Sequence, residues 1–171
     1  GQSWTTLSDI SGSGTSIAAG QGFLVYIFAD SDNDGTDDLP ITLSVSGTEN
    51  SGNATYPASG SLAANAWGLA GNPYYSTIDS DGFTKNQVNN VVYVWDDATS
   101  AYKQWNGVSG GLTDGLIAPF QGFWVQATSS GGGSIVISSS SKTTSAGTFY
   151  RIADMEESGS LSLTFTSIDN K

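Results

Sequence analysis

The chain has 171 residues, enough for one domain of ordinary size, and carries 16 acidic against 5 basic residues, a net charge of −11. This charge argues against a nucleic-acid-binding protein, because phosphate contacts require clustered lysine and arginine. Histidine and cysteine are absent, which removes the commonest general base, disulfide bonds and thiolate metal sites. The longest apolar run, residues 23–29, is too short to span a membrane. No signal peptide is recognised, so we expect a mature or excised piece.

Short segments rich in valine, isoleucine, threonine and aromatic residues alternate with clusters of glycine, asparagine, aspartate and serine. These segments suit the pleated surface of a sheet, and none keeps a helical period for three turns. The sequence therefore predicts a single all-β domain over 1–171, an antiparallel β-sandwich or jelly roll. The predicted strands are residues 22–28, 41–45, 67–70, 91–95, 122–127, 134–137, 148–152 and 161–166. Residues 138–147 are expected to form a loop or linker before the last two strands.

A nine-residue segment occurs twice along the chain, 100 residues apart. Residues 17–25 (IAAGQGFLV) and 117–125 (IAPFQGFWV) are identical at six of nine positions. We interpret the two copies as an internal repeat in which one type of strand is used twice. On this interpretation Phe23 and Phe123 both point into a core.

An acidic segment follows the first predicted strand: Asp30-Ser31-Asp32-Asn33-Asp34-Gly35-Thr36-Asp37-Asp38. Its spacing matches the first half of a calcium loop, with oxygen ligands at positions 1, 3 and 5 and glycine at position 6. We expect one structural Ca²⁺, held by Asp30, Asp32, Asp34, Asp38 and the Thr36 carbonyl. Position 12 is Ile41 and a strand precedes the loop, so this is not an EF-hand. The alternative is a solvated acidic turn.

Aromatic residues form a second candidate site. Tyr74 and Tyr75 follow the turn residues 71–73, and Trp105 lies in a polar stretch. We expect these three rings to stack on sugar faces; the alternative is that they seal loops against the sandwich. Rings inside strand-like runs are expected to belong mainly to the core, namely Trp67, Tyr93, Trp95, Phe120, Phe123 and Trp124.

The residues favour no catalytic site. The acidic residues form no recognisable pair of the kind that a glycosidase requires, and a serine nucleophile would have no histidine partner. We therefore expect that the chain is not an enzyme, and a hydrolase fragment is the least favoured alternative.

The last predicted strand is a candidate for strand addition. Residues 160–166 alternate polar and apolar side chains, which places Leu161, Leu163 and Phe165 on one face. This strand either completes its own sandwich or pairs with another copy or another domain. We hypothesise that it, or the amino-terminal segment, crosses to a neighbour and links subunits into a chain.

Several strings together resemble a β-rich module of large secreted, cell-surface proteins of Bacteroidota-type bacteria: Leu39-Pro40-Ile41-Thr42-Leu43, Trp67-Gly68-Leu69-Ala70-Gly71-Asn72-Pro73-Tyr74, Ile78-Asp79, residues 91–96 and residues 117–126. The resemblance covers roughly residues 4–150. In such proteins the module usually precedes a type IX secretion sorting signal, and it has no defined catalytic residues. The resemblance implies an extracellular structural, adhesive or assembly module. The alternative is a carbohydrate-binding module of a secreted polysaccharide-processing protein. The expected partners are copies of itself, neighbouring domains or polysaccharide.

Overall fold

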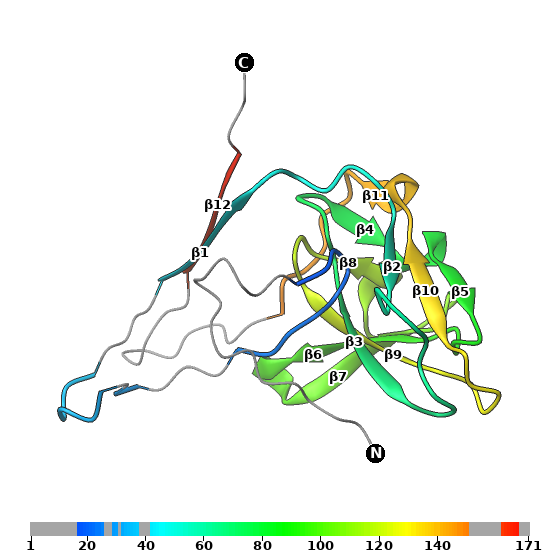
Figure 1. The fold of residues 1–171 in the computed structure, drawn as a ribbon, viewed down its shortest axis with the longest axis horizontal. Coiled ribbons are helices and arrows are strands. Elements are labelled where there is room, and N and C mark those ends of the chain that lie inside the picture. Colours follow the sequence, from blue (N-terminus) through cyan, green and yellow to red (C-terminus); the bar gives the residue numbers. More distant parts are fainter. Residues whose placement is uncertain (1–16, 26–28, 31, 38–41, 151–161, 168–171) are drawn as a thin grey trace.

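The computed structural model describes residues 17–25, 29–30, 32–37, 42–150 and 162–167 (Figure 1). In this part of the chain the structure consists of short strands and 3-10 turns of three residues each, with no longer helix. The predicted all-β class is confirmed, and the architecture is a β-sandwich. None of the described residues forms a helix that is long and apolar enough to cross a membrane.

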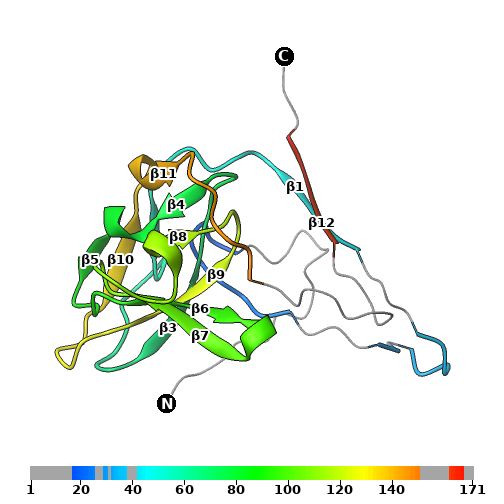
Figure 2. The same ribbon diagram turned by 180° about the vertical axis from the view of Figure 1, so that it is seen from behind.

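The sandwich is built from three antiparallel sheets. The four-stranded sheet has the order β3 (Trp67–Gly71), β9 (Gly122–Gln126), β6 (Val92–Asp96) and β7 (Ala101–Trp105). A three-stranded sheet has the order β2 (Ala54–Tyr56), β10 (Ser134–Ile137) and β5 (Thr84–Asn86). The other has the order β11 (Lys142–Thr143), β4 (Thr77–Asp79) and β8 (Leu116–Ile117). Figures 1 and 2 show these sheets gathered into one body.

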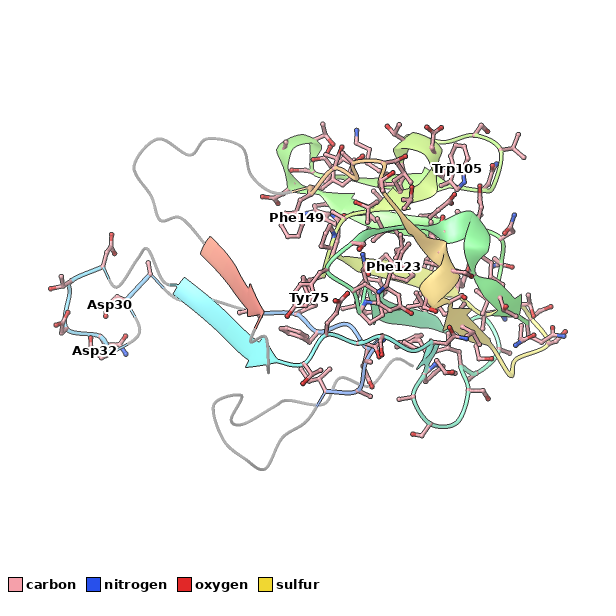
Figure 3. The ribbon with its side chains drawn as sticks, turned by 90° about the horizontal axis from the view of Figure 1, so that it is seen from above. Asp30, Asp32, Tyr75, Trp105, Phe123 and Phe149 are labelled. Carbon is pink, nitrogen blue, oxygen red and sulfur yellow. The ribbon has the colours of Figure 1, made fainter. Side chains whose placement is uncertain are left out.

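Alternating side chains of the strands form one hydrophobic core. Every second position is buried in β6, β9 and β10, which is the pattern of a strand with one face on a core. The core residues of these three strands are Val92, Val94, Phe123, Val125, Ile135 and Ile137. Phe123 lies between the sheets (Figure 3), with its ring centroid 5.6 Å from that of Phe83.

A separate pair of strands lies beside the sandwich in all three views (Figures 1–3). The strands β1 (Thr42–Gly47) and β12 (Ser162–Ser167) pair in parallel over their whole length and form a two-stranded sheet. Their register places Leu43 opposite Leu163 and Val45 opposite Phe165. The apolar positions of the two strands therefore coincide, as they must if the pair is to have one apolar face.

The two copies of the sequence repeat share a turn but not a strand. The backbone N–H of Gln21 donates to the carbonyl of Ala18 at 3.0 Å, and Gln121 donates to Ala118 at 3.2 Å. The second copy then continues into β9. The first copy makes a single bridge, from Gln21 to Ala70, and residues 22–25 form no strand. The prediction of one strand type used twice is therefore wrong for these residues.

Exposure differs between the copies as well. Phe123 is fully buried, whereas Phe23 is 52% exposed, so the expectation that both rings point into a core holds only for Phe123. Gly22 lies so close to β3 that a Cβ added there would stand 2.7 Å from the Ala70 carbonyl oxygen. The glycine of the first copy thus permits a close approach of two backbones.

The carboxyl-terminal part of the sandwich also departs from prediction. In the predicted strand 148–152, residues 148–150 form no strand, and residues 151 and 152 lie outside the described residues. Residues 26–28 of the first predicted strand also lie outside them. Residues 138–147, expected as a loop or linker, contain the 3-10 turn Ser139–Ser141 and the strand β11. Because β11 pairs with β4, this segment is part of the sandwich.

Asn72 joins two of the strings that carry the family resemblance. Its side chain is 3% exposed, and Nδ2 donates to the carbonyls of Ser76, Ile117 and Ala118 at 2.9, 3.2 and 2.9 Å. Its Oδ1 accepts the backbone N–H of Tyr74 at 3.0 Å. The amide therefore satisfies buried polar groups of two distant segments, which is a structural role.

Candidate functional site

The acidic loop brings three of its predicted metal ligands together. Carboxylate oxygens of Asp30, Asp32 and Asp34 lie within 4.8 Å of one another. Backbone N–H groups of the loop also point at these carboxylates: Gly35 donates to Asp30 Oδ2 at 2.9 Å, and Thr36 donates to Asp34 Oδ1 at 2.7 Å. Asp38 lies outside the described residues. Asp30 and Asp32 are carried on a loop away from the sandwich (Figure 3).

Calcium binding by this loop stays a prediction, and removal of the ion tests it. If Ca²⁺ binds only the folded loop, a hundredfold excess over Kd stabilises the chain by about 2.7 kcal/mol. For a domain of this size that corresponds to a rise of roughly 5–10 °C in Tm. We expect a chelator to reverse this rise in the full chain and to leave the Asp32→Asn/Asp34→Asn variant unchanged. An identical Tm with calcium and with chelator would identify a plain acidic turn.

Tyr74 is not available as a sugar-binding ring. Its side chain is fully buried, and its hydroxyl donates to the carbonyls of Gly52 and Ile137 at 2.8 and 3.0 Å. The ammonium of Lys142 lies 4.6 Å from its ring centroid. The prediction that this ring stacks on sugar is therefore corrected: Tyr74 is a core residue whose hydroxyl satisfies two backbone carbonyls.

Tyr75 and Trp105 occupy partly buried positions in different packing arrangements. Tyr75 packs edge-on against Phe120, with ring centroids 5.1 Å apart. Trp105 stands opposite Val92 in the register of β6 and β7, so it shares the core-facing side of the sheet. Its Nε1 donates to Asp81 Oδ1 at 2.9 Å. These two rings and Tyr74 therefore do not make one platform, and their arrangement favours the alternative that they seal the sandwich.

Another set of rings lies on the outer side of the four-stranded sheet. We call this surface the aromatic face; its rings come from all four strands and are Trp67, Tyr93, Trp95, Tyr102 and Trp124. The register pairs Tyr93 with Trp124 and Trp95 with Tyr102, and their neighbours Val92 and Val94 face the core. The prediction of a core role is therefore wrong for Trp67 and Trp95, which are 37% and 42% exposed.

Four rings of the aromatic face form two contacting pairs. Trp67 and Tyr93 have centroids 5.1 Å apart with ring planes crossed at 67°. Trp95 and Tyr102 have centroids 5.0 Å apart with planes crossed at 70°. Both pairs are edge-to-face arrangements, a favourable geometry for aromatic rings. Trp95 and Tyr102 are cross-strand neighbours, whereas Trp67 and Tyr93 come from β3 and β6, which β9 separates. Because the ring planes cross within each pair, the face is not one flat aromatic platform.

A set of polar contacts fixes the β6–β7 hairpin that carries one of these pairs. The Asp96 carboxylate accepts the Thr99 hydroxyl at 2.8 Å and the Ala98 backbone N–H at 3.2 Å, and it lies 3.3 Å from the Lys103 ammonium. The hydrogen bond from the Thr99 hydroxyl has the largest effect on the pKa of Asp96 and lowers it. Lys103 and the Ala98 N–H lower it further, so this pKa lies below its usual value although burial raises it. Trp95 Nε1 also donates to Asp97 Oδ1 at 3.2 Å. The hairpin therefore positions the Trp95 ring.

The residues predicted for strand addition lie at the β1–β12 pair. Leu163 and Phe165 belong to β12, where each stands opposite an apolar position of β1. Leu161 lies outside the described residues. Within the described part of the chain neither strand pairs with any other, so each has one unpaired edge. Such edges are the template for pairing with further strands.

Comparison with known proteins finds no family model that matches the chain, no matching curated protein and no matching solved structure.

Proposed function

We propose that this chain is a non-catalytic structural and adhesive module of an extracellular or cell-surface protein, and that it links to a neighbouring copy or domain through β1 and β12. The observation that carries the proposal is the parallel pairing of these strands beside the sandwich. The extracellular setting rests on the family resemblance of the strings in residues 39–43, 67–74 and 117–126.

A two-stranded sheet requires further partners. Two strands alone are marginally stable in water, and a third strand or a packed layer is needed for independent stability. Parallel strands in particular occur almost only in sheets with both faces covered. In the described residues, β1 and β12 have only each other as strand partners. A strand from a neighbour supplies main-chain hydrogen bonds to an open edge, and apolar positions in register supply the packing.

Loss of the last strand tests this proposal. Deleting residues 159–171 is expected to abolish self-association, because it removes β12, while the sandwich keeps its near-ultraviolet circular dichroism. A finer variant, Leu163→Thr/Phe165→Thr, introduces threonine, which favours strands, and removes the apolar side chains at these two positions. We expect it to weaken association in sedimentation velocity. The matched control is Thr164→Ser/Thr166→Ser, which alters the intervening polar positions and should associate like the wild type. Association that survives the deletion would overturn the proposal.

A further inference from the structure

The aromatic face carries no formal charge of its own. The strand positions on its side of the sheet hold aromatic, aliphatic, glycine and glutamine residues. One carboxylate that contacts it is that of Asp97, the acceptor of the Trp95 indole N–H. The whole chain has a net charge of −11. None of the described strand positions on this side of the sheet is a lysine or arginine, so an acidic ligand would meet repulsion there, whereas a neutral ligand meets no such cost.

Amide side chains lie among the rings. Gln104 is exposed and stands opposite Tyr93 in the register of β6 and β7. Gln126 stands opposite Trp67, and its amide joins Asn89 and the backbone of Asn65 through hydrogen bonds of 3.2 and 3.3 Å. A sugar ring has an apolar C–H face and a hydroxylated edge. Aromatic faces bordered by amides match that combination, since rings cover the apolar face and amides bond the hydroxyls.

The arrangement of the rings indicates whether the ligand is a single chain or a flat crystalline surface. Each pair contains one residue of β6, Tyr93 in one pair and Trp95 in the other. These two residues are two positions apart, which places their backbones about 7 Å apart along the strand. Within each pair the planes cross at 67° and 70°. Crossed rings cannot all lie against one flat crystalline surface. They can contact successive units of a single chain, each unit meeting a differently inclined ring.

We propose that the aromatic face binds a single chain of an uncharged polysaccharide across β6, with the Trp95–Tyr102 and Trp67–Tyr93 pairs as neighbouring contact points. This site is separate from the β1–β12 pair, so it goes beyond the assembly function and does not depend on it. It replaces the earlier candidate rings Tyr74, Tyr75 and Trp105, of which Tyr74 is buried.

Affinity electrophoresis of the full chain tests the site. Native gels contain a soluble neutral β-glucan, xylan, mannan or galactan, or an acidic alginate or pectate. We expect at least one neutral polymer to retard the wild type and neither acidic polymer to do so. The Trp95→Ala/Tyr102→Ala variant should bind that polymer about tenfold more weakly, because two exposed ring contacts are lost. Phe149→Ala is the matched control, since Phe149 is similarly exposed but lies off the sheet.

A second variant distinguishes a loss of polysaccharide binding from a loss of stability. If the double variant has a lowered Tm, Tyr102→Ala alone carries the test, because that side chain is 52% exposed. The proposal would be overturned if only the acidic polymers retarded the chain. It would also be overturned if the chain bound crystalline cellulose or chitin but no soluble polymer retarded it. Wild-type retardation of both variants, or no retardation by any neutral polymer, would overturn it as well. Loss of self-association in the double variant, with no polysaccharide binding by the wild type, would assign the face to a protein contact instead.

Discussion

Replacing Asn72 with alanine is expected to lower the free energy of unfolding by roughly 3–5 kcal/mol. The substitution leaves the buried carbonyls of Ile117 and Ala118 without their donor, and each such group costs about 1–3 kcal/mol when unsatisfied. The carbonyl of Ser76 and the backbone N–H of Tyr74 lose partners as well. Urea unfolding followed by tryptophan fluorescence measures the change.

Two further variants show whether burial of the amide is the cause. Asn72→Asp keeps the size of the side chain but removes its donor, so it should be at least as destabilising as alanine. Asn90→Ala removes an exposed amide that bonds the Asn106 carbonyl and Lys85 at 2.8 Å each, and water can replace those bonds. We expect it to cost less than about 1 kcal/mol. Equal losses for Asn72→Ala and Asn90→Ala would contradict the structural role given to Asn72.

Phe123→Ala is expected to destabilise the chain by about 3–5 kcal/mol, because it opens a cavity at a fully buried position beside Phe83. Phe23 occupies the same position in the first copy of the repeat but is 52% exposed. Phe23→Ala should therefore change stability by less than about 0.5 kcal/mol. Thermal and urea unfolding of the two variants give the comparison directly. Similar losses in both would mean that the two copies are structurally equivalent after all.

The longer strands of the sandwich, with the exception of β7, could be predicted from residue pattern. Residues 67–70, 91–95, 122–127 and 134–137 match β3, β6, β9 and β10 closely, because each segment is rich in apolar and aromatic residues and is bounded by polar turn residues. Five strands have only two or three residues, too few for a periodic pattern to be recognised: β2, β4, β5, β8 and β11. Strand β7 was missed for another reason: its sequence AYKQW is polar, and its strand character comes from pairing with β6.

The candidate sites depended on information that the sequence does not carry. Trp105 follows the polar residues Lys103 and Gln104, which predicted exposure, but its register opposite Val92 turns it toward the core. Trp95 lies in an apolar run, which predicted burial, but it alternates with Val94 and so lies on the outer side. In both cases the strand register decided which side of the sheet the ring occupies. A usable signal was the aromatic pair Tyr93 and Trp95 interleaved with Val92 and Val94.

The molar mass of the unmodified full chain, measured by light scattering across a concentration series, tests the central claim most directly. If β1 and β12 link neighbouring copies, the mass should rise with concentration through multiples of 17.6 kDa. The same series on the chain lacking residues 159–171 should stay at the mass of its monomer. A full chain that remains at 17.6 kDa over the whole series would contradict linkage between copies through this strand pair.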